Sequence, residues 1–242
     1  MRDSGRIVSG VIFDCDGVLA DTEATATAVG RRILADQGLH YTDESFRARF
    51  IGLGGPMFMA AAEADALERL GRGVGDLWPL LSRSITEAVL AEVQPVPGMA
   101  ELVRATLPAK AVASASPRVE LVGKMAALGL SDQFAGGMWS ADDVVSPKPS
   151  PDLYLAALAK LEIEAGAGLA IEDSPSGVRA ARAAGLRVLG FVGASPHPLL
   201  EAQGLLAAGA FAIAGDAGEA AALFQAEGVA LSAMVRASGA RK

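Results

Sequence analysis

VIFDCDGVLADTE, residues 11–23, carries two aspartates, Asp14 and Asp16, directly after a short apolar run. The run closes an apolar segment at residues 7–13 that lacks strict alternation, which predicts a strand buried on both faces. Gly17 follows the second aspartate and allows the backbone to turn sharply there. Two like charges at the edge of a core are unfavourable unless another part of the chain or a bound ligand compensates them.

Further apolar runs alternate with helical patterns along the chain. Short runs at residues 111–113, 169–171, 188–192 and 211–213 predict buried parallel strands. Between them, Ala, Leu and Val recur at helical spacing at residues 98–107, 118–128, 153–161 and 177–184. This alternation predicts an α/β fold with a doubly wound, Rossmann-like parallel sheet.

One long segment breaks the alternation. Residues 22–93 contain no strand pattern and show helical patterns instead, at residues 23–37, 43–50, 57–70 and 77–92. The segment is too long for an ordinary connection between a strand and a helix. We therefore expect an α/β core formed by residues 1–20 and 94–242, with residues 21–93 inserted as a helical-bundle cap domain.

The composition excludes several classes of protein. Of the 242 residues, 51% are hydrophobic and 20% are charged, which predicts a large buried core. The net charge of −7 does not fit a nucleic-acid-binding surface. Cys15 is the single cysteine, and no apolar segment is long enough to span a bilayer. We expect a cytoplasmic protein, monomeric or homodimeric, that binds a small molecule and no membrane.

Four polar clusters follow the predicted strands or precede the helices. Ligands of doubly wound sheets bind at the carboxyl ends of the strands, so these clusters should meet at one edge. Each cluster alone fits ordinary turn or capping chemistry, but together their carboxylates would repel one another without a cation. A hard divalent ion with oxygen ligands, most simply Mg²⁺, resolves that conflict. The residues concerned are Asp14 and Asp16, Ser114, Lys148, and Glu172 with Asp173.

A Ser-Pro pair stands at the start of three predicted helices. The pairs begin at Ser116, Ser150 and Ser174, each directly behind one of the polar clusters. Serine is a preferred N-cap and proline a preferred first helical residue. The pattern predicts three capped helix N-termini facing the strand ends, where their backbone N–H groups favour an anion.

These clusters resemble the ordered motifs of the haloacid dehalogenase-like hydrolase superfamily. The resemblance extends to its subgroup of sugar-phosphate phosphatases and β-phosphoglucomutase-like enzymes, in which a helical cap is inserted at the same place. It spans residues 7 to about 192. The matching strings are Asp14-x-Asp16-Gly-Val-Leu, Ser114, Lys148-Pro and Glu172-Asp173-Ser.

The resemblance implies a role for each matched residue. Asp14 would attack phosphorus to form an aspartyl-phosphate, and Asp16 would protonate the leaving oxygen and then activate water. Ser114 would hydrogen-bond a phosphoryl oxygen, and Lys148 would neutralise charge on Asp14 and the phosphate. Mg²⁺ would be held by Asp14, the Asp16 backbone carbonyl, Asp173 and Glu172, the last directly or through water. The further candidates for substrate contact are Gly17, Ala115, Arg118 and, in the cap, Arg49.

The resemblance also separates the alternative functions. Dehalogenases of the superfamily lack the second aspartate, so Asp16 argues against dehalogenation. Mutases carry a histidine and an arginine in the cap, at positions that align with about Ala26 and Gly55 here, which favours hydrolysis. A phospho-acceptor signalling or binding module remains as an alternative from another class. We expect a Mg²⁺-dependent phosphatase acting on a small phosphate ester, most simply a sugar phosphate.

Overall fold

The computed structural model describes residues 7–50, 53 and 55–232. The chain divides into two compact units. Residues 1–21 and 93–242 form one, called here the core unit, and residues 22–92 form the other, called the cap unit. Both divisions lie one residue from the boundaries expected from the sequence. Residues 233–242, most of the Ala- and Gly-rich tail that follows Ala230, lie outside the described residues.

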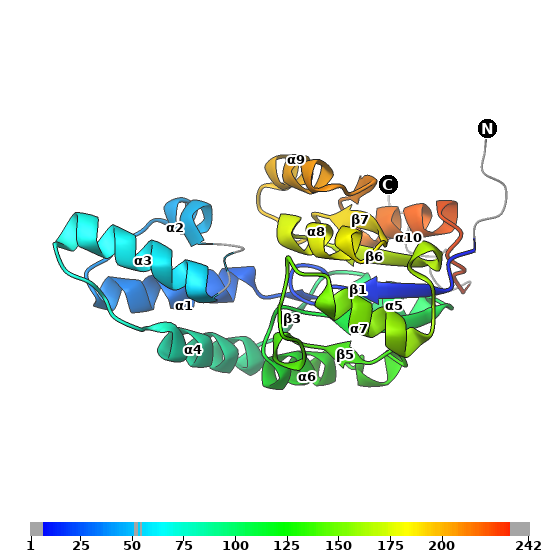
Figure 1. Cartoon of the computed structure of the whole chain (residues 1–242), viewed down its shortest axis with the longest axis horizontal. Helices are drawn as coiled ribbons and strands as arrows, with labels where there is room; N and C mark the ends of the chain where they lie inside the picture. The colour runs from blue at the N-terminus through cyan, green and yellow to red at the C-terminus, as the bar shows by residue number, and fades with distance from the viewer. Residues whose placement is uncertain (1–6, 51–52, 54, 233–242) are drawn as a thin grey trace. The chain divides into compact units, whose positions relative to one another are not determined.

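The core unit is built on a six-stranded parallel sheet in the order β5-β4-β1-β6-β7-β8 (Figure 1). Strand β1 lies in the middle, and its neighbours on either side come from distant parts of the chain. This arrangement confirms the expected doubly wound α/β fold. The strands are β1 (Gly10–Phe13), β4 (Ala109–Ala113), β5 (Met138–Trp139), β6 (Gly168–Glu172), β7 (Arg187–Phe191) and β8 (Ala212–Ala214).

Helices connect these strands and pack on both faces of the sheet. The chain passes from each parallel strand to the next through at least one helical segment, as parallel pairing requires. The helices are α5 (Met99–Ala105), α6 (Arg118–Ala127), α7 (Asp152–Leu161), α8 (Pro175–Ala183), α9 (Pro198–Ala208) and α10 (Ala217–Ala226). Short 3₁₀ helices are η1 (Ser131–Gln133), η2 (Ala141–Asp143) and η3 (Ala165–Ala167).

Alternation along β1 assigns its side chains to two separate hydrophobic clusters. Val11 and Phe13 pack on one face with residues of α5, α6 and α10. Ile12 packs on the other face with residues of α7, α8 and α9. Each face of the sheet is therefore covered by its own helical layer, and polar groups can reach solvent only at the strand ends.

A two-stranded antiparallel ribbon stands where the chain leaves and re-enters the core unit. It pairs β2 (Ala20–Asp21) with β3 (Gln94–Pro95). The ribbon fastens both ends of the inserted segment to each other, so the insertion leaves the order of the core strands unchanged.

The cap unit consists of α1 (Glu23–Asp36), α2 (Asp43–Phe50), α3 (Gly55–Leu70) and α4 (Trp78–Ala91). Its centre is aromatic: the rings of Phe46, Phe50 and Phe58 lie 4.6–6.1 Å apart between centroids. Among the described residues of the whole chain, no helix is both long enough and apolar enough to cross a membrane.

The sequence patterns miss β5, α9 and α10. Strand β5 has two residues, too few to show any period. Helix α9 carries exposed Leu199 and Leu200 beside buried Leu205, so its apolar residues do not gather on one face. Helix α10 is rich in alanine, which gives a weak contrast between its faces.

Candidate active site

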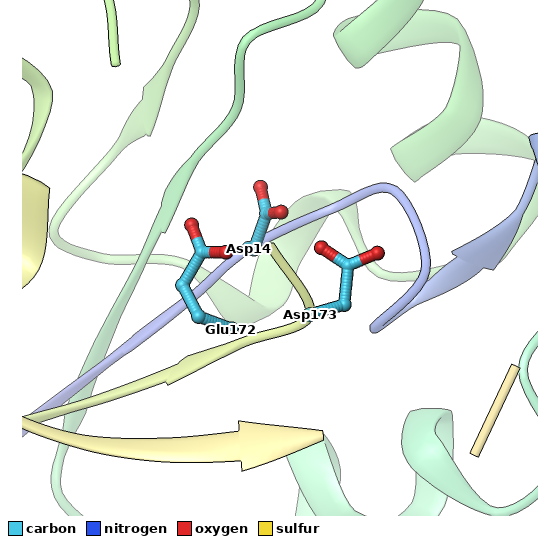
Figure 2. A group of neighbouring side chains, drawn as sticks. All are labelled: Asp14, Glu172 and Asp173. Carbon is cyan, nitrogen blue, oxygen red and sulfur yellow. The ribbon is translucent and has the colours of Figure 1, made fainter. Parts of the chain in front are cut away.

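Three carboxylates meet beyond the ends of β1 and β6. Asp14 follows β1, Glu172 ends β6, and Asp173 comes next in the chain. The strands are in parallel register, with Phe13 opposite Ile171, so their ends reach the same edge. One oxygen from each carboxylate lies within 4.8 Å of the others. Figure 2 shows the three side chains gathered at this place. The topology therefore gathers charges that are far apart in sequence.

Burial and mutual repulsion make this cluster hard to ionise. Burial first, and then the neighbouring Glu172, raise the pKa of Asp14 to about 7. The pKa of Asp173 is raised well above its ordinary value, again by burial and then by Asp14 and Glu172. A cation among these oxygens would remove the repulsion and stabilise the ionised carboxylates.

Lys148 supplies one positive charge to the cluster. Its Nζ donates to Asp14 Oδ1 at 2.8 Å and to Glu172 Oε1 at 2.5 Å. Burial alone would lower the pKa of Lys148, but the attraction of Asp14 and Glu172 outweighs it and raises that pKa. The side chain therefore stays charged beside the carboxylate expected to be the nucleophile.

Hydrogen bonds fix the orientation of Glu172. The Tyr154 hydroxyl donates to Glu172 Oε1 at 2.6 Å, and both polar groups of Ser174 donate to Oε2, the backbone N–H at 3.1 Å and the hydroxyl at 3.0 Å. Burial raises the pKa of Tyr154 well above its ordinary value, and Glu172 raises it further. Tyr154 is therefore a hydrogen-bond donor that holds a carboxylate in place.

Gly17 occupies a position that no other residue fits. Its φ of +71° lies in the left-handed region. A Cβ built there would stand 1.8 Å from Oδ2 of Asp173, far inside contact distance. The tight turn predicted after the two aspartates therefore needs glycine for a second reason: the missing side chain leaves room for Asp173.

Asp16 turns toward the loop after β4 and toward helix α6. Its Oδ2 accepts from the Ser116 hydroxyl at 2.7 Å and from the Ser114 hydroxyl at 3.4 Å. Its Oδ1 accepts from Lys124 Nζ at 2.6 Å. Ser114 itself is buried and accepts from the Ser116 backbone N–H at 3.0 Å. The structure thus brings Asp16 and Ser114 together, as the positions of the motifs predict.

The remaining substrate candidates lie in different settings. Ala115 is exposed on the loop after β4. Arg118 begins α6, where its Nη1 donates to the Met138 carbonyl at 2.6 Å and its Nη2 pairs with Asp143. Arg49 belongs to the cap unit, where its Nη2 donates to Asp65 at 2.7 Å. Both guanidinium groups thus have carboxylate partners within their own units, and substrate contact by these two residues stays a prediction.

The serine-capping prediction is correct for one of the three helices. The Ser174 hydroxyl accepts from the Gly177 N–H at 3.1 Å and caps α8, with Pro175 as the first helical residue. Ser116 and Ser150 do not cap α6 and α7, because their hydroxyls are directed to the side chains of Asp16 and Asp152 instead. In both of these helices a proline occupies the N-cap position.

Tyr154, Glu120 and Lys124 were not identified as part of the site from the sequence, and Ser116 was placed beside Ser114 without its contact to Asp16. Tyr154 lies on an apolar helix face six residues beyond Lys148, and a buried tyrosine needs a partner for its hydroxyl. Glu120 and Lys124 have the spacing of a solvated helical ion pair, which conceals their burial. Ser116 was interpreted as a cap. Only Tyr154 offered a signal that could have been used.

Known proteins are similar to this chain in both sequence and fold. The sequence model of the haloacid dehalogenase-like hydrolase family matches residues 8–185 of this chain. A phosphorylated carbohydrates phosphatase of Thermotoga maritima is 34% identical over 212 residues, covering 85% of this chain and 94% of that protein. Fructose-1-phosphate phosphatase YqaB of Escherichia coli is 32% identical over 185 residues, covering 74% and 93%. A hydrolase from Deinococcus radiodurans, solved with bound phosphate and sodium, superposes with a TM-score of 0.74 at 29% identity, covering 93% and 99%.

Proposed function

The chain belongs to the haloacid dehalogenase-like hydrolase family, and we propose that it is a divalent-metal-dependent phosphatase of small phosphate monoesters, using Asp14 as its nucleophile. The observation that carries this proposal is the buried cluster of Asp14, Glu172 and Asp173 with Lys148 at the ends of two adjacent strands. A buried cluster of that composition is poorly suited to structural support, because its negative charges outnumber its positive one.

The donor set fits a hard divalent cation. Carboxylate oxygens are the ligands that Mg²⁺ prefers, and Asp14 and Asp173 both have raised pKa values that a cation would lower. Asp14, Asp173, the Asp16 backbone carbonyl and Glu172 are the residues that would hold it. When bound, the ion would supply positive charge against the phosphoryl oxygens.

The chain's own residues would then carry out two chemical steps. In the first, an Asp14 carboxylate oxygen forms a bond to phosphorus while the ester bond breaks, and the departing oxygen takes the proton carried by Asp16. In the second, Asp16 takes a proton from water, whose oxygen attacks phosphorus and releases phosphate and Asp14. Ser114 and Lys148 donate to the phosphoryl oxygens and the nucleophile, which is how positioning and charge lower such barriers.

A sugar phosphate is the substrate class that the relatives support. The two curated relatives above are named for phosphorylated carbohydrates and for fructose 1-phosphate. Hydrolysis is favoured over mutase chemistry by the cap unit itself. Gly55 aligns with about one of the two cap positions at which mutases carry a histidine or an arginine. It packs against Trp78 so closely that a Cβ would stand 2.4 Å from the indole ring.

A phosphate-release screen tests the proposal. Purified protein is assayed against sugar phosphates, phosphoglycolate, phosphogluconate and nucleotides, with Mg²⁺ or with EDTA. We expect many turnovers per site on at least one sugar phosphate, dependence on Mg²⁺, and loss of turnover in Asp14→Asn. The matched control is Asp132→Asn, the same change at an exposed residue of η1. Release of one equivalent or less from every ester would indicate a phospho-acceptor module and refute the proposal.

A further inference from the structure

Lys124 is a charged residue in the core, outside all of the motifs. It lies on α6, and its side chain has no exposed surface. The same helix buries Leu121 and Met125 in the hydrophobic cluster on that face of the sheet. Burying an ammonium group is costly unless it is paired and hydrogen-bonded, so an apolar residue would be the ordinary choice at this position.

The three protons of the ammonium each have an acceptor. Nζ donates to Asp16 Oδ1 at 2.6 Å, to Glu120 Oε1 at 2.7 Å and to the Ser116 hydroxyl at 2.8 Å. Attraction to Asp16 and Glu120 outweighs burial and raises the pKa of Lys124, so the group stays charged. Glu120 is itself almost completely buried. The ammonium is therefore held by a built cradle of three side chains.

This cradle fixes both oxygens of Asp16. Oδ1 is held by Lys124 directly, and Oδ2 is held by Ser116, whose hydroxyl oxygen is in turn fixed by Lys124. A hydroxyl has one proton, and the shorter contact from Ser116, 2.7 Å against 3.0 Å to Glu120, directs that proton to Asp16. The Asp16 side chain nevertheless remains 33% exposed while its orientation is set.

We propose that Lys124 is a positioning residue that holds Asp16 in the orientation in which it exchanges protons with the leaving group and with water. This inference rests on the proposed function. Asp16 is attached to the turn at Gly17 and has two rotatable side-chain bonds, and a proton-transfer group must lie within hydrogen-bond reach of its target to contribute. Lys124 supplies the orientation from behind the site and touches neither the substrate nor the carboxylate cluster in this role.

The test is Lys124→Met, which keeps the length of the side chain and removes its charge. With p-nitrophenyl phosphate, whose leaving group needs no proton, the first step should survive and the second should slow. We therefore expect a burst of about one equivalent of nitrophenolate per site, followed by a steady state slowed roughly 10- to 100-fold, part of the general acid–base contribution. For this ester kcat/KM should change by less than about threefold, because it reports the surviving first step and the substrate contacts remain. KM should therefore fall in parallel with kcat.

With a sugar phosphate accepted by the wild type, both steps need Asp16. The loss in kcat/KM should then exceed the loss on the aryl ester, because the first step is now slowed as well, and no accumulation of phosphoenzyme is expected. The matched control is Lys110→Met, which removes a partly buried lysine of β4 that donates to the Thr106 carbonyl. This control should keep wild-type kinetics.

A double-mutant cycle separates positioning from simple structural support. In an Asp16→Asn background, Lys124→Met should lower kcat by less than about twofold further, because the group it positions is already gone. Equal losses in both backgrounds, or a single variant with wild-type kcat and no burst, would overturn the inference. If Lys124→Met does not fold, the variant that also carries Glu120→Gln removes the leftover buried charge, and the same criteria apply to it.

The proposed function and the role of Lys124 would be refuted by different results. A wild-type protein without Mg²⁺-dependent turnover would refute the proposed function itself. A wild-type protein with turnover and an unaffected Lys124→Met variant would refute only the role of Lys124.

Discussion

Replacing Asp14 with asparagine should make the metal-free protein more stable while it abolishes activity. Burial and the nearby Glu172 raise the pKa of Asp14 from 3.8 to about 7. The folded state thus binds this proton more tightly than the unfolded state does. The stability that the group contributes is therefore fully present below about pH 4 and is lost as the pH rises through about 7.

The size of the effect follows from the same pKa. Ionising Asp14 in the folded, metal-free protein costs about 4 kcal/mol at about pH 8. At about pH 5.5 the cost is about 2 kcal/mol, because most folded molecules still carry the proton. Asparagine avoids ionisation and keeps an oxygen that can accept from Lys148. For a chain of this size, about 1 kcal/mol shifts Tm by roughly 2–4 °C.

Thermal unfolding in EDTA, followed by circular dichroism, measures the difference. We expect Asp14→Asn to melt roughly 8–16 °C above the wild type at about pH 8 and roughly 4–8 °C above it at about pH 5.5. Saturating Mg²⁺ should raise the wild-type Tm and narrow the gap, since the ion stabilises the ionised cluster. The exposed Asp132→Asn variant should match the wild type throughout.

An Asp14→Asn variant no more stable than the wild type at about pH 8 would contradict the raised pKa of Asp14. A gain in stability that grows as the pH falls would also contradict it, because the sign of the linkage would then be reversed. Either result would mean that the three carboxylates do not crowd one another in the folded protein.

Three further changes test other parts of the site. Gly17→Ala, whose Cβ would stand 1.8 Å from Asp173 Oδ2, should lower both Tm and Mg²⁺-dependent activity, the latter by more than about tenfold. Its matched control is Gly71→Ala, at φ +66° with nothing within 4 Å of the Cβ, which should lower Tm slightly and leave kcat unchanged. Asp173→Asn should raise the Mg²⁺ concentration for half-maximal rate by more than about tenfold, measured by titration of phosphate release. Tyr154→Phe removes the 2.6 Å hydrogen bond to Glu172 and should reduce stability by about 1.5–3 kcal/mol, measured by denaturation in EDTA.

The fold could be predicted from the sequence because its helices are long enough to show a period and most of its strands are continuous apolar runs that end at polar residues or glycine. The central strand ends at Phe13, directly before Asp14 interrupts the apolar run, and β6 ends at Glu172, where its apolar run also stops. The two residues of β5 carry no such signal, since a strand of that length is set by its neighbour β4 and not by its own composition.

The motif residues of the site could also be predicted from the sequence, because the topology places the strand ends at one edge of the sheet. Once β1 and β6 are adjacent, Asp14 and Asp173 have to lie near each other. The hydrogen bonds that support these residues could not be predicted in this way. Ser116 looks like an N-cap by position, and only the presence of Asp16 across the loop redirects its hydroxyl.

Lys124 shows why local patterns cannot identify such residues. Glu120 and Lys124 stand four residues apart on a helix, the spacing of an ordinary solvated ion pair worth a few tenths of a kcal/mol. What converts this pair into a buried network is Asp16, which comes from more than a hundred residues earlier in the chain. Under the proposed mechanism the Asp16 carboxylate needs a fixed orientation to exchange protons, and in this fold it contacts Lys124 of α6. The cation on the inner face of α6, Lys124, is then explained by the position of Asp16. The sequence of α6 alone does not reveal that role.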